Sequence, residues 1–159
     1  FGGIHTAQNH AGYLQLNYKS NGWVFEGGSR FEYFKLDDKE RSTPVFRAGI
    51  NKQLARGTFL RASYGEGYRF PSMAELFTAT SSGGISVLPN PDLEPESSKS
   101  IGLGIKQGVK LGKTQGYIDV AGFYTRLTNL MEYTFGNWQE SIGIPNFGFK
   151  SFNILESEI

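Results

Sequence analysis

The sequence predicts an all-β fold, in which antiparallel up-and-down strands form part of a large transmembrane β-barrel. Three observations lead to this prediction. Apolar and polar residues alternate along about six segments, as they do in strands whose two faces meet different surroundings. Each segment holds roughly 9 to 14 residues, which is the length that a tilted strand needs to cross a bilayer. The connections alternate between short and long, an arrangement typical of outer-membrane barrels.

The composition agrees with such a barrel and excludes several other classes. The chain of 159 residues contains 21 glycines and 14% aromatic residues, yet only 38% of its residues are hydrophobic. No run of about 18 apolar residues occurs, so a membrane-spanning helix is excluded, whereas alternating strands average to a neutral hydropathy. The net charge of +1 gives no reason to expect a nucleic-acid partner. Cysteine is absent, which leaves no disulfide framework and no thiol chemistry.

The first two predicted strands form a hairpin around Asn21-Gly22, a dipeptide that favours tight turns because both positions need positive φ. The apolar face of this hairpin is predicted to carry Leu14, Leu16, Tyr18, Trp23, Phe25, Phe31 and Tyr33. The opposite face is predicted to carry Gln15, Asn17, Lys19, Glu26, Arg30 and Glu32. The alternation therefore separates aromatic and aliphatic side chains from charged and amide side chains.

The later strands repeat this separation. Their apolar sets are Phe46, Ala48 and Ile50, then Leu60, Ala62 and Tyr64, then Ile101, Leu103 and Ile105, and finally Ile118, Val120 and Tyr124. The polar sets between them include Arg47, Arg61, Ser100 and Asp119. We expect short turns near residues 20–22, 53–57 and 108–114, and longer connections at 37–43, 66–97 and 128–149.

Each face suits a different medium. An arginine or lysine that faces lipid at mid-depth costs about 2 to 4 kcal/mol, so the charged faces are expected to line a hydrated lumen and the apolar faces to meet acyl chains. Aromatic residues near strand ends are typical of interfacial girdles. Those expected here are Tyr18, Trp23, Phe59, Tyr64, Tyr68 and Tyr117. A soluble antiparallel sheet with one solvated face gives the same alternation and remains an alternative.

Two motifs flank the longest connection. The first comprises Gly67, Tyr68, Arg69, Pro71 and Ser72, and the second comprises Asn90, Pro91, Leu93, Pro95, Glu96 and Ser97. Together they resemble the barrel domain of TonB-dependent outer-membrane receptors, and the resemblance extends over nearly the whole chain. The same residues also have a structural interpretation, because proline lacks an amide hydrogen and ends strand pairing. Arg69 can pair with a carboxylate of the connection, such as Glu75 or Glu96.

The resemblance implies energy-coupled import of a scarce solute, such as a siderophore, haem, cobalamin or an oligosaccharide. It also implies a bacterial outer-membrane location and four partners: outer-membrane lipid, TonB through a plug region, the imported small-molecule or glycan ligand, and a surface lipoprotein. Family members carry a plug domain inside a barrel of about 22 strands. We therefore expect residues 1–159 to be an internal barrel fragment of about six to seven strands, without plug, signal peptide and remaining strands.

The two longest connections are expected to supply the ligand-binding residues, since exposed aromatic side chains suit flat or sugar-like ligands. The candidates are Arg69, Phe77, Tyr133, Phe135 and Trp138. Packing of these side chains within their own loops is an equally good interpretation. No catalytic residue, metal site or cofactor is expected, because no pattern of enzymatic residues occurs. A passive outer-membrane porin or adhesin barrel, and a soluble β-sandwich binding module, remain alternatives.

Overall fold

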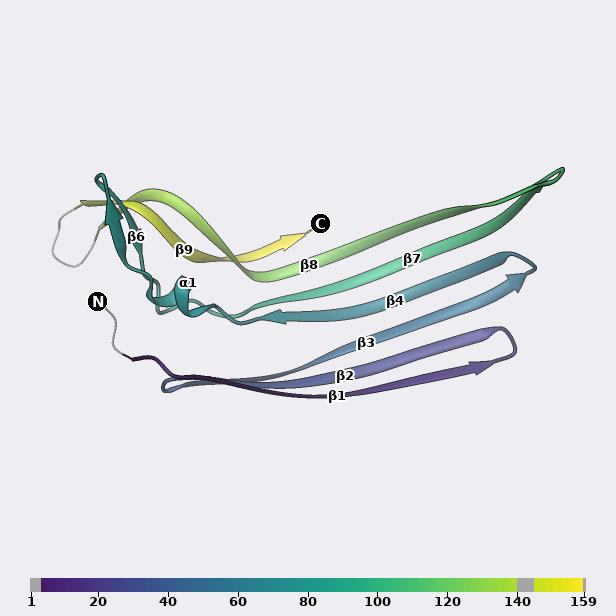
Figure 1. Cartoon of the computed structure of the whole chain (residues 1–159), viewed down its shortest axis with the longest axis horizontal. Helices are drawn as coiled ribbons and strands as arrows, with labels where there is room; N and C mark the ends of the chain where they lie inside the picture. Colours follow the sequence, from purple (N-terminus) through teal and green to yellow (C-terminus); the bar gives the residue numbers. More distant parts are fainter. Residues whose placement is uncertain (1–3, 140–144, 159) are drawn as a thin grey trace. The chain divides into compact units, whose positions relative to one another are not determined.

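A computed structural model of the chain describes residues 4–139 and 145–158, within which nine strands and one short helix are found (Figure 1). The strands are β1 (Ala7–Ser20), β2 (Trp23–Leu36), β3 (Lys39–Ala55), β4 (Thr58–Arg69), β5 (Thr80–Ser82), β6 (Ile85–Leu88), β7 (Glu96–Leu111), β8 (Thr114–Gln139) and β9 (Pro145–Glu158). The helix α1 covers Met73–Phe77. Among the described residues, no helix is long and apolar enough to cross a membrane.

All nine strands belong to one sheet with the order β1-β2-β3-β4-β7-β8-β9-β6-β5. The seven long strands follow the order of the chain, as expected for up-and-down strands, and the β1–β2, β2–β3 and β3–β4 pairs are antiparallel. The short hairpin of β5 and β6 lies within the predicted connection 66–97 and was not anticipated. Its β6 pairs with β9 in parallel, so the sheet is mostly rather than wholly antiparallel.

The chain divides into two compact units, which we describe separately. Among the described residues, the sheet unit comprises 7–67, 98–126 and 158, and the helix unit comprises 4–6, 68–97, 127–139 and 145–157. The strands β4, β7, β8 and β9 have residues in both units, whereas β1, β2 and β3 belong wholly to the sheet unit.

Tight turns connect the strands of the sheet unit. Asn21 and Gly22 both adopt positive φ, 47° and 75°, which confirms the predicted hairpin. The turns after β1, β3 and β7 lie at one end of this unit, and the turn between β2 and β3 lies at the other (Figure 1).

The predicted longer connection at 37–43 is wrong, because β3 already begins at Lys39. The chain reverses at Asp37-Asp38, where Asp37 has a φ of 50°. Lys35 and Glu40 then face each other across the hairpin, with an Nζ–Oε1 distance of 2.8 Å. Cross-strand pairing therefore extends the strands through a segment whose polar composition suggested a loop.

The register of the sheet unit confirms the two predicted faces. Residues paired across an antiparallel ladder point to the same side. One cross-strand row consists of Leu16, Gly27, Ala48 and Tyr64, and the adjacent row consists of Asn17, Glu26, Gly49 and Ser63. The apolar and polar sets therefore stay apart over four strands.

The apolar face of the sheet unit is not covered by protein. Leu16, Phe31, Leu103 and Val120 are 67%, 53%, 62% and 60% exposed, respectively. A soluble β-sandwich would bury these side chains against a second layer, and the described residues form no second sheet. Hydrocarbon is the medium that such an apolar face requires.

Charged groups that share the apolar face lie toward its ends. Lys52 places its Nζ 4.5 Å from the centre of the Trp23 ring, next to the tight turns. Glu66 accepts hydrogen bonds from the Phe46 amide at 3.0 Å and from the Tyr64 hydroxyl at 2.6 Å. The stretch from Phe46 to Lys52 rises roughly 20 Å, close to the apolar band of about 25 Å in outer-membrane barrels.

The helix unit has a small core of its own, built from Leu76, Leu88, Leu93 and Met131. Strands occupy much of the predicted connection 128–149, because β8 runs to Gln139 and β9 starts at Pro145. Residues 140–144 lie outside the described residues. The other predicted connection, 66–97, contains the end of β4, α1, β5, β6 and the start of β7. The predicted connections 66–97 and 128–149 therefore included residues that belong to strands or to the helix.

The contrast between the two faces predicts that the same substitution costs different amounts of stability at adjacent positions. In the intact protein in a bilayer, Leu16→Arg should lower the free energy of unfolding by about 2 to 4 kcal/mol, because it exposes a charge to lipid. Asn17→Arg is the matched control, since it adds the same charge opposite Glu26 on the polar face and should cost much less. Denaturant unfolding in lipid vesicles measures both. Equal losses would contradict the assignment of the faces.

Candidate functional site

The polar face of the sheet unit carries arginines that lie flat across a neighbouring strand. Arg47 of β3 extends over Gly28 of β2 and donates a hydrogen bond to the side chain of Gln15 in β1. A Cβ on Gly28 would lie 3.1 Å from the Arg47 Nε and 3.2 Å from the Leu14 carbonyl oxygen. Glycine therefore leaves the space through which the arginine reaches its partner two strands away.

The same arrangement recurs on β4, β7 and β8. Arg61 of β4 forms a two-pronged ion pair with Asp119 of β8, at Nη1–Oδ2 and Nη2–Oδ1 distances of 3.0 and 2.8 Å. Gly104 of β7 lies buried beneath it, and a Cβ there would come within 2.7 Å of the Arg61 Nε. Two-pronged pairs of this kind fix both partners in orientation as well as in distance.

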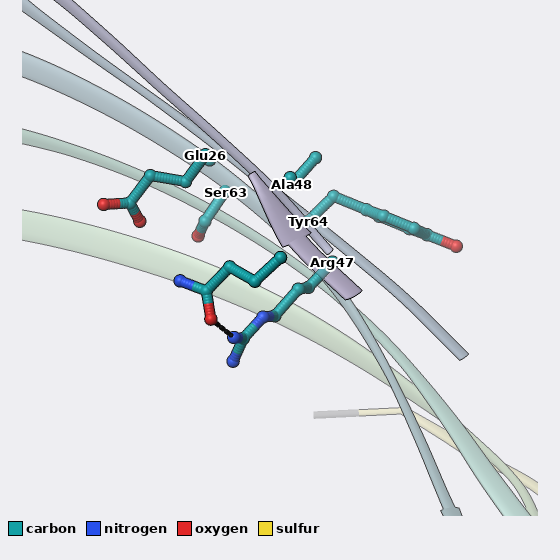
Figure 2. Close-up of a pocket in the computed structure, with 8 residues that line it drawn as sticks. Glu26, Arg47, Ala48, Ser63 and Tyr64 are labelled. Atoms are coloured by element: carbon teal, nitrogen blue, oxygen red, sulfur yellow. Dashed lines mark hydrogen bonds between the residues drawn. The ribbon is translucent and has the colours of Figure 1, made fainter. Parts of the chain in front are cut away.

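A shallow depression between β1, β2, β3 and β4 shows the division of the faces directly (Figure 2). Glu26, Arg47 and Ser63 point to one side of the strands, whereas Ala48 and Tyr64 point to the other. The polar side thus presents a carboxylate, a guanidinium and a hydroxyl together. Such a surface can hold water or another polar surface, and it suits a hydrated lumen.

In the helix unit, Ser72 starts α1 with a reciprocal cap. The Glu75 amide donates to the Ser72 Oγ at 3.2 Å, and the Ser72 amide donates to the Glu75 Oε2 at 2.7 Å. This capping box satisfies two amides that the first turn leaves free. Our sequence analysis missed the helix, although the Ser-x-x-Glu spacing at residues 72–75 is its ordinary signal.

Arg69 is held between two carboxylates, so the expectation that it pairs with Glu75 or Glu96 is confirmed for both. Its Nε lies 2.8 Å from one Glu96 oxygen, and its Nη2 lies 3.1 Å from the other. Its Nη1 lies 3.0 and 3.1 Å from the two Glu75 oxygens. Glu96 also accepts from the Met131 amide at 3.2 Å. This cluster connects α1 to the strands β4, β7 and β8.

The charges of the cluster stabilise one another. Hydrogen bonds from Arg69 and from the Met131 amide hold the pKa of Glu96 below its ordinary value. Partial burial pushes the pKa of Glu75 upward, but hydrogen bonds from Ser72 and Arg69 outweigh it and leave that pKa lowered. The hydrogen bond to Glu96 raises the pKa of Arg69. All three groups therefore stay ionised at neutral pH.

The aromatic candidates lie on ordered elements. Phe77 ends α1 and stacks on His5, with ring centres 4.0 Å apart and an interplanar angle of 6°. Tyr133, Phe135 and Trp138 were expected on a loop but lie on β8. This segment has a loop-like composition but forms a strand because β8 pairs with β9. Local sequence does not show that pairing.

Two of these candidates, Phe135 and Trp138, contact residues of β9. Tyr133 and Phe135 are 49% and 50% exposed, and Phe135 meets Phe149 edge to face at 5.1 Å. Trp138 donates its Nε1 hydrogen to the Gly148 carbonyl oxygen at 3.0 Å, and the Lys150 Nζ lies 5.7 Å from its ring. Sequence analysis missed Phe149 and Lys150, whose place beside these residues depends on the pairing of β9. Because successive strand residues point to opposite faces, Phe135 and Phe149 offer apolar surface on one face, and Trp138 and Lys150 offer a ring beside a cation on the other.

Within residues 4–139 and 145–158, no group of three or more histidine, aspartate or glutamate side chains is arranged to hold a metal ion.

Comparison with known proteins identifies a family. A family model described as "TonB dependent receptor-like, beta-barrel" matches residues 1–154. No curated protein matches the sequence significantly.

Solved structures share the fold at low sequence identity. The hemophore receptor HasR of Serratia marcescens, solved in complex with its hemophore HasA and heme, matches 96% of this chain with a TM-score of 0.79 and 18% identity. The copper transporter OprC matches 97% with a TM-score of 0.71 and 17% identity. The siderophore receptor PirA from Pseudomonas aeruginosa matches 97% with a TM-score of 0.55 and 14% identity. The chain spans 30%, 25% and 38% of these proteins, respectively.

The arginine that crosses Gly104 yields a first prediction for this site. Gly104→Val should displace Arg61 from Asp119 and destabilise the intact protein by about 1 kcal/mol, the range of a partly exposed ion pair. Gly122→Val is the control, since a Cβ at Gly122 meets no atom within 4 Å. The free energies of unfolding of Gly104→Val, Asp119→Asn and the double variant give the coupling energy between positions 104 and 119. Fully additive losses would show that Gly104 does not act through the ion pair.

The lowered pKa values of Glu75 and Glu96 predict loosening in acid. Their stabilisation is present above the ordinary value of 4.5 and is lost as the pH falls through the lower folded-state values. Amide exchange of α1, corrected for the intrinsic effect of pH, should therefore accelerate at about pH 3 relative to neutral pH. In a Glu75→Gln, Glu96→Gln variant, the exchange should already be fast at neutral pH. Unchanged protection of the unmodified protein in acid would refute the role of these charges.

Proposed function

This chain belongs to the family of TonB-dependent receptor β-barrels, and on that premise we propose that it forms part of a bacterial outer-membrane receptor that imports a large, scarce solute. TonB-dependent receptors are transporters rather than enzymes. The observation that carries the proposal is a single sheet with two uncovered faces, one apolar and one charged. A sheet of this kind suits the wall between lipid and a hydrated lumen.

The ends of the strands give the proposed orientation. Outer-membrane barrels have short periplasmic turns and longer extracellular connections. The tight turns at residues 21–22, 56–57 and 112–113 are therefore assigned to the periplasmic side. The connection between β4 and β7, which contains α1, then emerges on the extracellular side. An arriving solute would meet this connection and the far end of β8.

Aromatic residues at the far end of β8 are the proposed ligand contacts of this chain. Tyr133, Phe135 and Trp138 offer flat apolar area, which suits ring-shaped or sugar-like ligands. Phe77 is a further candidate, although it already stacks on His5. Arg69 is better suited to hold the connection in place, since all three of its guanidinium nitrogens already donate to carboxylates.

The proposed ligand is a ferric siderophore, haem, cobalamin or an oligosaccharide, and the similarity to a copper transporter adds copper to this set. The proposed partners are outer-membrane lipid, TonB acting through a plug region, and a surface lipoprotein. HasR is bound to a hemophore protein, which gives a precedent in this fold for a protein that delivers the ligand.

Uptake by cells that produce the full-length receptor tests this function. Radiolabelled ferric siderophores, haem, cobalamin, copper and malto-oligosaccharides would be supplied to cells with and without TonB. We expect uptake of at least one of these solutes to require both the receptor and TonB. Uptake that depends on the receptor but not on TonB would instead support a passive porin.

Loss of an aromatic side chain at the far end of β8 should weaken ligand binding. Phe135→Ala or Trp138→Ala should raise the Kd of the imported solute roughly fivefold, the effect of losing one aromatic contact of about 1 kcal/mol. Phe123→Ala is the matched control, because Phe123 is an exposed aromatic residue of β8 in the sheet unit. Titration of the purified receptor with the solute identified by uptake measures all three. An equal Kd for each variant and the unmodified receptor would contradict the assignment.

A further inference from the structure

Two cations of the sheet unit lie opposite each other on neighbouring strands. The strands β7 and β8 form a hairpin that turns at residues 112–113 (Figure 1). Ser100 and Thr125 lie the same number of residues from this turn, and their hydroxyl oxygens are 2.8 Å apart, which fixes the register of the two strands. Lys99 and Arg126 are therefore the next opposed residues, farther from the turn. We call these two residues the cation pair.

The cation pair lies on the apolar face of the sheet unit. Residues two apart in a strand share a face, so Lys99 shares the face of Ile101, and Arg126 shares the face of Tyr124. Both cations are exposed. In the proposed orientation the turn at residues 112–113 is periplasmic, so the cation pair lies at the extracellular edge of the apolar band.

A neighbouring carboxylate compensates the charge of Lys99 only in part. Glu66 of β4 is close enough to Lys99 to attract it electrostatically. However, one Glu66 oxygen already accepts from the Phe46 amide at 3.0 Å, and the other accepts from the Tyr64 hydroxyl at 2.6 Å. Within the part of the chain that the structure describes, the Lys99 ammonium forms no hydrogen bond and no ion pair at contact distance.

Other lysines of the apolar face have such a partner. The Lys35 Nζ lies 2.8 Å from a Glu40 oxygen. The Lys52 Nζ donates to the Asn21 carbonyl oxygen at 3.0 Å. Lys99 differs from both, because its donors remain available to a group that approaches the apolar face from outside.

Arg126 can also serve such a group. Its Nε lies 4.0 Å from the Glu158 Oε1, and that oxygen accepts from the Tyr124 hydroxyl at 2.5 Å. The side chains of Arg126 and Glu158 are 53% and 55% exposed. A guanidinium carries N–H donors on more than one edge, so Arg126 can face a carboxylate on one edge and a further anion on another.

A phosphate-bearing lipid fits these features. Like charges that oppose each other in a sheet destabilise it, and an anion bound between them removes the repulsion. Phosphate has several oxygens, so it can accept hydrogen bonds from an ammonium and a guanidinium at the same time. Next to the cation pair, Ile101, Leu103 and Val120 are 53%, 62% and 60% exposed on the same face. Acyl chains can cover this apolar surface, whereas free phosphate gains nothing from it.

We propose that the cation pair binds the phosphate group of a phosphorylated lipid in the extracellular leaflet, with the acyl chains along Ile101, Leu103 and Val120. The proposal rests on the proposed function for its orientation, which decides the leaflet. All residues of this site belong to the sheet unit. The site lies on the face opposite to Arg47 and Arg61, so it is separate from the proposed path of the solute.

Titration of the purified full-length receptor in a non-ionic detergent with diphosphoryl lipid A, a phosphorylated glycolipid, tests the site. Lys99→Gln combined with Arg126→Gln should raise the Kd at least about tenfold, because charge-assisted hydrogen bonds to phosphate are lost. Lys35→Gln is the matched control, since Lys35 is a cation of the same face that pairs with Glu40. Its Kd should be unchanged. An equal Kd for the double variant and the unmodified receptor would overturn the proposal.

Two further measurements do not depend on the folding of the double variant. Lys99→Arg keeps the charge and should leave the Kd within about twofold of that of the unmodified receptor. Lipid A stripped of both phosphates should bind the unmodified receptor at least about tenfold more weakly. Equal binding of the two lipids would show that acyl chains alone are recognised, and loss of binding in Lys99→Arg would show that charge is not what matters. Either result would contradict the proposal.

Inorganic phosphate separates a lipid site from a general anion site. Millimolar phosphate should leave lipid A bound, and its displacement by phosphate would contradict the assignment to a lipid. Binding of lipid A requires neither TonB nor transport. The site can therefore be confirmed even where the uptake experiment shows no dependence on TonB and the proposed function fails.

Discussion

The structure depends on one constraint: a paired ladder sends adjacent side chains to opposite sides, and here neither side is covered by the chain itself. The ladder consumes the backbone hydrogen-bonding groups, so the side chains alone decide what each face can meet. Leu16 and Val120 need an apolar medium, whereas Arg47 and Arg61 need a polar one. No single solvent suits both sets. A wall between hydrocarbon and water satisfies both, which links the alternation in the sequence to the transport function of the family.

Three glycines of the sheet leave space that neighbouring groups occupy. At Gly28 and Gly104 the missing Cβ allows an arginine to lie across a strand and reach a partner two strands away. The charged groups thereby stay close to the wall instead of extending from it. At Gly148 the same absence allows a second backbone to approach β9. Gly22 is required in its turn because its φ is positive. At Gly28, Gly104 and Gly148, glycine is required because a neighbouring side chain or backbone occupies the space of a Cβ.

The sequence predicted those features that depend on residues close together in the chain. The separation of Leu16 from Asn17, the turn at Asn21-Gly22 and the pairing of Arg69 with nearby carboxylates all follow from periodicity, turn chemistry or charge. The strand character of Tyr133, Phe135 and Trp138 was not predicted, because it depends on a distant partner strand. The parallel pairing of β6 with β9 is non-local in the same way. The helix α1 differs, since Ser72 and Glu75 carried a recognisable signal that was overlooked.

The most direct test of the account is a nitroxide scan along β1 of the full-length receptor in lipid vesicles, from residue 12 to residue 19. Single cysteines would be spin-labelled in turn, and collision with oxygen, which concentrates in lipid, would be compared with collision with a water-soluble nickel complex. A strand between lipid and lumen should show a period of two, with oxygen favoured at positions 14, 16 and 18 and nickel favoured at positions 15, 17 and 19. A profile without that period, or with the two sets reversed, would contradict it.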